Sequence, residues 1–480
     1  MSHVIRGFLV AMGSTLFLFG GAHSHSRPAP LGVPGQLPLH LFTEKGLPEE
    51  AIGLSVAVLN TRESPDPVRW LGHRSEQAMN PASTVKLITT RAAWSILGPD
   101  YRHRTQFLTT GRLAAGRLRG PLYLRGGGDP KLVVEDIEAI VLSLRSAGVR
   151  HIEGDLILDA TRFAEPIADP NAFDGMGYKP YNVTPYAAML NFKAVRVRVT
   201  TTAAGKLRGE IDPALSGLRL RLALKRVRGG CSRNQVQLIS KPNIIEATGR
   251  MGRACSTFES YLAVYDHDQF AHRLFSATWR AAGGSFVGKV RSGRTPDHAR
   301  LLLDWVSPRP LHELVADINK LSNNPMARTL FLNVSAEAGG PGTRADAQER
   351  VKSWLLTQNL HFPEMVLDNG SGLSRLDRIA PKNLTRLLVQ AMRGPGAQEW
   401  LDTLPAAGLE GTLRRRLKDG AVTGRAWVKT GTLEGVRAYS GYVRTETGHW
   451  VAFSAIINHP NAVVGGPSLE AFVKWLVETL

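Results

Sequence analysis

Residues 80–87 read Asn80-Pro81-Ala82-Ser83-Thr84-Val85-Lys86-Leu87. Asparagine followed by proline is typical of an N-cap and a first helical position, and Gly98-Pro99 supplies a stop signal further on. The sequence therefore predicts a helix over residues 81–97. Ser83 and Lys86 are three positions apart, so they would share one helical face in the first turn.

This spacing suits nucleophilic catalysis. A serine nucleophile needs a base within hydrogen-bond reach, and the positive end of a helix favours a developing oxyanion. A Ser-x-x-Lys match is nevertheless expected about once by chance in a chain of this length. The alternative is a capping serine beside a solvated lysine, so other motifs must decide between the two.

A second motif, Lys429-Thr430-Gly431, occurs once and lies on a predicted strand next to another strand. A glycine there allows a substrate backbone to approach closely. Chance produces this triplet in only a few per cent of chains of this length, by average residue usage. The alternative is a solvated strand end.

A Ser-x-Asn motif would complete the set, and the sequence offers two. Ser232-Arg233-Asn234 lies beside Cys231, whereas Ser322-Asn323-Asn324 lies between helical segments at Leu311–Leu321 and Met326–Val334. A turn between helices can direct two polar side chains into a cleft. We therefore favour Ser322 and Asn324, and interpret the other match as surface sequence near a disulfide.

Strand patterns occur at both ends of the chain. They predict one five-stranded antiparallel sheet, with strands at Leu54–Asn60, Val68–His73, Arg425–Gly431, Ala438–Arg444 and His449–Ile457. The last segment spaces Leu469, Phe472, Val473, Leu476 and Leu480 as in a helix. Its charges are mixed rather than basic, so a core helix on the sheet is favoured over a membrane-binding foot.

The N-terminus indicates export. Arg6 precedes an apolar stretch over residues 8–19 and then Ala22-His23-Ser24, which predicts a signal peptide over residues 1–24, with a retained anchor as the alternative. Residues 25–39 are proline-rich and predict a linker. After residue 24 no apolar run is long enough to span a bilayer, so we expect no transmembrane span in the mature chain. In an oxidising compartment we expect Cys231 and Cys255 to form a disulfide.

Composition narrows the remaining classes. Of 480 residues, 43% are hydrophobic and 21% charged, which is typical of a globular protein rather than a disordered one. The net charge of +18 favours polyanionic neighbours, such as nucleic acid, anionic lipid or a charged wall polymer. Export removes nucleic acid as a partner. No Cys or His pair has ligand spacing, so we expect neither a metal nor a cofactor.

Together the three motifs correspond to the set of class A β-lactamases and penicillin-binding proteins. The sequence resembles more closely the low-molecular-mass class C penicillin-binding proteins, the D-alanyl-D-alanine carboxypeptidase/endopeptidase family. Further matching stretches cover nearly the whole mature chain: Gly126-Gly127-Gly128-Asp129-Pro130, Tyr181-Asn182, Asp368-Asn369-Gly370-Ser371-Gly372-Leu373-Ser374-Arg375, Leu404-Pro405-Ala406-Ala407-Gly408 and Val428-Lys429-Thr430-Gly431-Thr432-Leu433. The middle motif reads Ser-Asn-Asn instead of Ser-Asp-Asn, and Arg328 stands where the family commonly has Glu.

The resemblance implies an α/β (α+β) fold, with a penicillin-recognising serine transpeptidase/β-lactamase-like domain. This domain would consist of a five-stranded antiparallel sheet flanked by helices, interrupted by smaller inserted domains. We expect the catalytic domain over 40–100 and 296–480, an inserted domain over 101–191 and 257–295, and a second, nested insertion over 192–256.

The resemblance also implies roles for the motif residues. Ser83 would attack the penultimate D-alanine of a peptidoglycan stem peptide, Lys86 would be the base, Ser322 would relay a proton and Asn324 would position Lys86 and the substrate. Backbone amides of Ser83 and Thr432 would form the oxyanion hole, while Lys429 and Thr430, with Gly431 beside them, would bind the terminal carboxylate.

The expected protein is thus a periplasmic or otherwise extracytoplasmic carboxypeptidase, endopeptidase or both, inhibited by β-lactams, and a homo-oligomeric state is left open. Two alternatives stay open: a β-lactamase or esterase of the same fold, and a non-catalytic wall-binding scaffold protein. The lifetime of a penicilloyl-enzyme separates the first alternative, and the absence of acylation at Ser83 would indicate the second.

Overall fold

The computed structural model describes residues 36–60, 66–231, 235–394, 396–418 and 420–480. The signal peptide predicted over residues 1–24 lies outside these ranges. Of the linker predicted over 25–39, residues 25–35 also lie outside them. Within them, no helix combines the length and the apolar character that a bilayer crossing requires.

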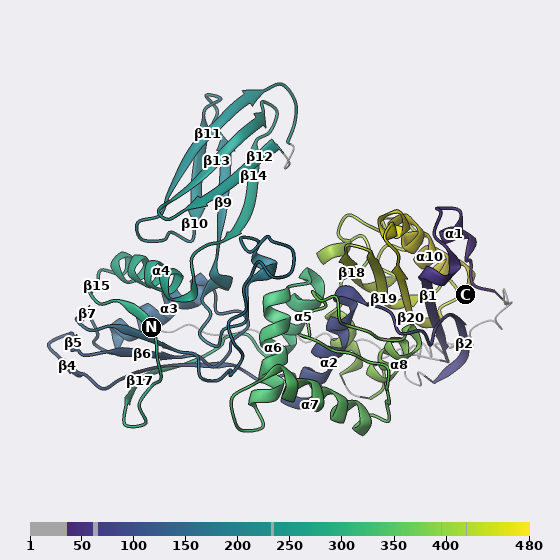
Figure 1. Ribbon diagram of the computed structural model, residues 1–480, viewed down its shortest axis with the longest axis horizontal. Helices are drawn as coiled ribbons and strands as arrows, with labels where there is room; N and C mark the ends of the chain where they lie inside the picture. Colours follow the sequence, from purple (N-terminus) through teal and green to yellow (C-terminus); the bar gives the residue numbers. More distant parts are fainter. Residues whose placement is uncertain (1–35, 61–65, 232–234, 395, 419) are drawn as a thin grey trace, which may run out of the picture.

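A five-stranded sheet joins the two ends of the chain, which confirms the predicted sheet (Figure 1). Its spatial order is β18-β19-β20-β1-β2, and each neighbouring pair is antiparallel. The strands are β1 (Ile52–Leu59), β2 (Pro67–His73), β18 (Ala426–Leu433), β19 (Val436–Arg444) and β20 (Trp450–Asn458). β18, which carries the Lys-Thr-Gly motif, is therefore an edge strand.

Helices cover both faces of this sheet. All 8 residues of β1 are buried, as expected for a strand with helices on both sides. On one face, α8 (Pro381–Ala391) contacts β1 and β20. On the other, α10 (Gly465–Thr479) packs with the short α1 (His40–Thr43) in a cluster that includes Val56 and Phe472. The C-terminal segment is thus a core helix, as predicted.

A group of helices surrounds α2 (Lys86–Leu97), most of whose side chains are buried. Its neighbours are α5 (Leu311–Leu321), α6 (Asn324–Ala336) and α7 (Arg344–Thr357). From α9 (Ala397–Asp402), Trp400 packs edge-on against Trp94 of α2. Because α2 lies inside this group, the residues at its N-terminus are held by packing on several sides.

The prediction of a helix over residues 81–97 is wrong at the first turn. Ala82–Val85 forms a 3-10 turn, and the α-helix begins only at Lys86. Ala82 has a φ of 45°, a left-handed conformation that an α-helix does not contain. Pro81 is the N-cap residue of this turn, and the Asn80 Oδ1 before it accepts a hydrogen bond from the Ala82 amide at 2.9 Å.

A first inserted unit follows α2, and it consists of two sheets with α3 (Val134–Ser146) and α4 (His267–Ala281). One sheet has the order β16-β8-β6-β3-β17 and the other β15-β7-β5-β4. The strands are β3 (Arg104–Thr109), β4 (Arg112–Ala114), β5 (Arg117–Arg119), β6 (Leu122–Arg125), β7 (His151–Ile152), β8 (Leu156–Asp159), β15 (Ser285–Phe286), β16 (Val290–Ser292) and β17 (Arg300–Val306).

A nested unit, Ala194–Ala263, interrupts the first inserted unit. It contains β9 (Ala194–Thr201), β10 (Leu207–Asp212), β11 (Arg219–Val227), β12 (Val236–Lys241), β13 (Ile244–Gly252) and β14 (Thr257–Ala263). These strands form two three-stranded sheets, β10-β9-β14 and β11-β13-β12. Figure 1 shows the nested unit extending away from the rest of the molecule, beyond α4.

Strand pairing places two segments differently from the domain division expected from the sequence. β14 pairs with β9, so residues 257–263 lie in the nested unit. β17 pairs with β3, so residues 300–306 lie in the first inserted unit. We propose on this basis a nested unit over 194–263 and a first insertion that extends to 306.

The disulfide predicted between Cys231 and Cys255 is confirmed. Its sequence separation of 24 closes a loop within the nested unit, so the chain-entropy model assigns it about 3 kcal/mol. Replacing both cysteines by serine should lower the thermal midpoint of the nested unit but leave penicillin acylation rates unchanged. Calorimetry and acylation kinetics on the double variant test this, and an equal loss of both properties would mean that the unit also supports catalysis.

Candidate active site

The predicted nucleophile and base are in contact. Ser83 lies in the 3-10 turn and Lys86 begins α2. Residues three apart are eclipsed in a 3-10 helix, so they come close together. The Lys86 Nζ donates to the Ser83 Oγ at 3.0 Å. The turn therefore creates the Ser–Lys contact that the sequence predicted, through a tighter helix than expected.

Lys86 is completely buried, with a relative exposure of 0%. Its Nζ also donates to the Asn324 Oδ1 at 2.6 Å and to the backbone carbonyl of Ser371. These acceptors come from the start of α6 and from the 368–375 loop. Two segments that are distant from α2 in the sequence thus direct the amine toward Ser83.

The surroundings of Lys86 favour its neutral form. Burial lowers the pKa of Lys86 well below its usual value, and the positive charges of Lys429 and Arg328 lower it further. The carboxylate of Asp377 acts in the opposite direction and raises this pKa. A lysine with a lowered pKa can take a proton from a serine hydroxyl, which a fully charged lysine cannot.

Ser322 occupies the bend between two helices, as predicted. It follows the last residue of α5 with a φ of 57°, and Asn323 caps α6 by accepting from the Met326 amide. This sharp turn directs Ser322 toward β18, where its Oγ accepts a hydrogen bond from the Lys429 Nζ at 2.9 Å. Asn324, two residues later, faces Lys86.

Lys429 is also completely buried. Its Nζ donates to Ser322 and to the Thr430 carbonyl at 2.8 Å, and burial lowers its pKa to about 7. The two lysines therefore lie beneath the site, each joined to one of the two motif serines. Among the described residues, no carboxylate forms an ion pair with either lysine.

Gly431 has a structural neighbour that the sequence did not indicate. A Cβ at this position would lie 2.7 Å from the Pro81 carbonyl oxygen. We expected the lack of a side chain at this position to allow a substrate backbone to approach closely. In the structure it allows the turn that carries Ser83 to lie close to β18. β18 thus lies directly against that turn, and Thr432, the next residue, is exposed.

A cleft of about 670 Å³ lies over these residues. It is lined by the four motif side chains Ser83, Ser322, Asn324 and Thr430, and by Tyr181, Arg375, Thr432 and Arg437. Lys86 and Lys429 do not line it, since both ammonium groups are covered. The structure therefore brings together every predicted site residue, but it places both lysines behind the serines.

Three residues that were not predicted as site residues support this arrangement. Asn80 joins the nucleophile turn to its neighbours, because its side-chain amide donates to the Ser374 carbonyl and its backbone exchanges hydrogen bonds with Asn458. Ser371 holds Lys86 through its carbonyl, and Arg328 donates from Nε to the Ser371 Oγ at 3.3 Å. Asn80 and Ser371 belong to the stretches quoted above, but nothing in their local sequence indicated these contacts.

The alternative motif, Ser232-Arg233-Asn234, lies outside the described residues. The neighbouring Cys231 belongs to the disulfide of the nested unit. Within the described part of the chain, no group of three or more His, Cys, Asp or Glu side chains is placed to hold a metal ion.

Comparison with known proteins identifies the family of this chain. Residues 42–478 match the model of the D-Ala-D-Ala carboxypeptidase 3 (S13) family. A D-alanyl-D-alanine carboxypeptidase of Actinomadura sp. (strain R39) is 31% identical over 400 residues, which cover 79% of this chain and 73% of that protein.

Solved structures agree as well. Penicillin binding protein 4 (dacB) from Haemophilus influenzae superposes with a TM-score of 0.72 at 25% identity, covering 92% of this chain and 98% of that one. Its complex with a β-lactam superposes with a TM-score of 0.66, covering 91% and 97%. Because the family model matches residues 42–478, which are most of this chain, the chain belongs to the D-Ala-D-Ala carboxypeptidase 3 (S13) family.

Proposed function

We propose that this member of the family removes the terminal D-alanine from peptidoglycan stem peptides through an acyl-enzyme on Ser83. The observation that carries this proposal is the contact of the Ser83 Oγ with the buried Lys86 Nζ at the base of an open cleft. The predicted leader and the wall substrate support a location in the periplasm or otherwise outside the cytoplasm.

In the first step, the Ser83 Oγ bonds to the carbonyl carbon of the penultimate D-alanine while its proton passes to Lys86. The lowered pKa of Lys86 supports this role, because a neutral amine is needed to accept the proton. The C–N bond then breaks, and the leaving nitrogen takes up a proton through Ser322. The Asn324 Oδ1 accepts a hydrogen bond from the Lys86 Nζ at 2.6 Å and so holds this amine in position beside Ser83.

Two further groups act on the substrate. The oxyanion would be bound by backbone amides of Ser83 and Thr432, since the edge strand β18 leaves backbone donors unpaired along the cleft. The terminal carboxylate would be bound by the Thr430 and Thr432 side chains. Lys429 lies just beneath them and contributes its charge through a medium of low dielectric constant.

Water then hydrolyses the acyl-enzyme: its oxygen bonds to the acyl carbon, one of its protons passes through Lys86 to the Ser83 Oγ as the ester bond breaks, and the Ser83 hydroxyl and the neutral Lys86 are restored. If the leaving amine belongs to a cross-linking residue with a free carboxylate, the same steps cleave a cross-link. The protein would then be an endopeptidase as well. A β-lactam, whose ring amide and carboxylate resemble the D-alanyl-D-alanine end, would acylate Ser83 and block the site.

Labelling tests the nucleophile. A fluorescent penicillin should modify Ser83 alone, because the Ser83 Oγ contacts the Lys86 Nζ, which is the base in the proposed mechanism. Peptide mapping of the labelled protein should locate the label there, and Ser83→Ala should carry none. Label on Ser322, or label retained in Ser83→Ala, would contradict the proposed mechanism.

The role of Lys429 is tested with a substrate whose terminal carboxylate is amidated. A charge-assisted interaction is worth about 1.5–3 kcal/mol, so amidation should lower acylation of the unmodified enzyme by roughly ten- to a hundredfold. Lys429→Ala should lose a similar amount with the free acid and little more with the amide. Additive losses would instead assign the carboxylate to another cation, Arg437 or Arg375, both of which line the cleft.

The pH dependence of acylation tests the charges around Lys86, which are Lys429, Arg328 and Asp377. Arg328→Met removes a cation that lowers the pKa of Lys86, so this pKa should rise. The acidic limb of the profile of acylation rate against pH should then shift to higher pH by about half a unit to one unit. Arg328→Lys should retain most of the original profile.

Arg344→Met is the matched control, because Arg344 pairs with Glu165 and Asp368 and is not among the charges that act on Lys86. Its acidic limb should not move. An unchanged limb in Arg328→Met, or a limb shifted to lower pH, would show that Arg328 does not set the basicity of Lys86.

A further inference from the structure

The charge of this protein is concentrated in one unit. The nested unit, Ala194–Ala263, contains 13 Lys and Arg against 4 Asp and Glu, a net charge of +9. The whole chain has a net charge of +18, so half of it lies in these 70 of the 480 residues. Neither the catalytic chemistry nor the packing of the central sheet requires this concentration.

Strand register places much of this charge on one face. Along β11, Arg219, Arg221 and Lys225 are exposed, whereas the leucines between them point inward. On the neighbouring β13, Arg250 lies opposite Lys225. We call this surface the basic face, defined by Arg219, Arg221, Lys225, Arg250 and Lys241, which ends β12.

Most of the basic face is not neutralised. Glu246 is the acid that lies among these cations, and it pairs with Arg221 at 3.3 Å and with Lys241 at 2.7 Å. Arg219, Lys225 and Arg250 form no ion pair with any described residue. Alternate residues of a strand are about 6.5–7 Å apart, so the face presents charges in rows that suit a chain with repeated negative groups.

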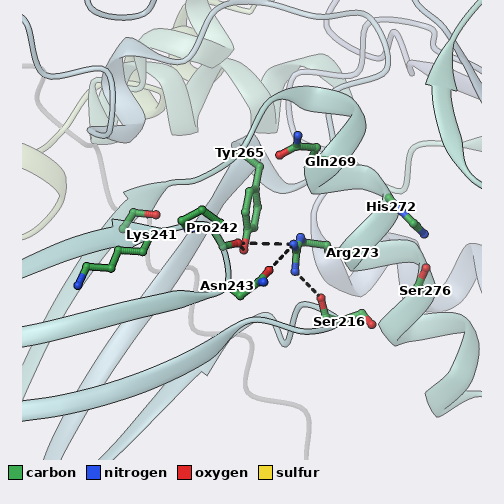
Figure 2. A pocket seen from close by; sticks show the side chains of 10 residues that line it. Ser216, Lys241, Pro242, Asn243, Tyr265, Gln269, His272, Arg273 and Ser276 are labelled. Atoms are coloured by element: carbon green, nitrogen blue, oxygen red, sulfur yellow. Dashed lines mark hydrogen bonds between the residues drawn. The ribbon is translucent and has the colours of Figure 1, made fainter.

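A hollow of about 880 Å³ continues from the basic face, between the β12–β13 turn and α4 (Figure 2). Lys241 belongs to both the face and the hollow, and Arg273 of α4 lies across from it. The hollow is lined by hydroxyls, amides and cations, and none of its lining residues is a carboxylate. It therefore combines hydrogen-bond donors for sugars with positive charge.

The walls of the hollow are held in place. The Arg273 guanidinium stacks on the Tyr265 ring at 4.4 Å and donates to the Ser216 carbonyl at 2.9 Å and to the Asn243 Oδ1 at 2.7 Å, as Figure 2 shows. The Tyr265 hydroxyl donates to the Pro242 carbonyl. These contacts join the nested unit to α4, so the hollow is formed without a ligand.

We infer that the basic face and the hollow bind the glycan strand of the wall polymer, a carbohydrate chain that carries anionic stem peptides. Its sugars offer hydroxyl and amide groups to the hollow, and its stem peptides offer carboxylates to the basic face. A flat lipid surface could meet the basic face but could not enter the hollow, so a strand fits both features better. The identity of the polymer rests on the proposed function.

Binding here would concentrate substrate without taking part in the chemistry. Figure 1 shows the nested unit well separated from the sheet that carries the Lys-Thr-Gly motif. A polymer attached at the nested unit raises the effective concentration of its own stem peptides at Ser83. The effect should therefore appear with polymeric substrate and be absent with a small peptide or a penicillin.

The test measures co-sedimentation with insoluble purified peptidoglycan, using Ser83→Ala so that binding is separated from cleavage. In this background, Arg219→Gln, Lys225→Gln and Arg250→Gln combined should weaken binding roughly tenfold and reduce its salt dependence. The matched control removes three exposed cations from the first inserted unit, Arg112, Arg294 and Arg300, with the same change of net charge. It should bind like the parent.

A second variant addresses the hollow. Gln269 is exposed at its wall, and its side chain forms no hydrogen bond with a described residue, so Gln269→Trp should fill the hollow without disturbing the core. It should also weaken binding. Equal losses in the triple variant and its control, no loss in the triple variant, or no loss on filling the hollow would overturn the inference.

Two further measurements separate this inference from its alternatives. Tighter binding to anionic vesicles or to DNA than to peptidoglycan at the same salt concentration would overturn it, because the partner would then be of another class. With Ser83 intact, the triple variant should be acylated by penicillin at the parent rate. If peptidoglycan is bound but never cleaved by the intact enzyme, the proposed function fails while the binding surface stands.

Discussion

The buried amine of Lys86 is the constraint on which the active site depends. A lysine without solvent must have hydrogen-bond acceptors, since an unsatisfied charged group in the interior is costly. Ser83, Asn324 and the Ser371 carbonyl provide them from the 3-10 turn, from α6 and from the 368–375 loop. Any displacement of these segments would leave the amine without partners, so the same contacts that satisfy Lys86 also align the catalytic groups.

A second constraint follows from the first. Lys429 is buried close enough to lower the pKa of Lys86, and two cations in one interior repel each other. In the fold each amine donates a hydrogen bond to a different serine, Lys86 to Ser83 and Lys429 to Ser322, and this keeps the two amines apart. Burial lowers both pKa values, which reduces the repulsion because each amine spends more time neutral. Burial disfavours the charged form of each lysine, which is an energetic cost. The same effect supplies the neutral Lys86 amine that the chemistry needs.

Much of this organisation was predictable from the sequence. The strands of the central sheet have strong β patterns at both ends of the chain, and the three motifs located the site. The 3-10 turn was not predictable, because the positive φ of Ala82 results from packing beneath β18 and the 368–375 loop. The burial of Lys429 and the role of Ser371 depend on tertiary contacts. The different limits proposed for the insertions depend on the pairing of β14 and β17 with strands distant in the sequence.

The contact between β18 and the nucleophile turn links substrate binding to the position of Ser83. A Cβ at Gly431 would collide with the Pro81 carbonyl, and one at Gly372 would lie 2.1 Å from the Ala82 carbonyl. The turn is therefore enclosed by an edge strand on one side and a loop on the other, and Asn80 bonds Asn458 at the end of β20 and Ser374 of that loop. A substrate that adds to the edge of β18 meets a strand that cannot shift without moving Ser83. In the mechanism proposed above, the edge strand would therefore hold the substrate and its nucleophile in fixed relative positions, and residues that do not touch the substrate would determine how well the two are aligned.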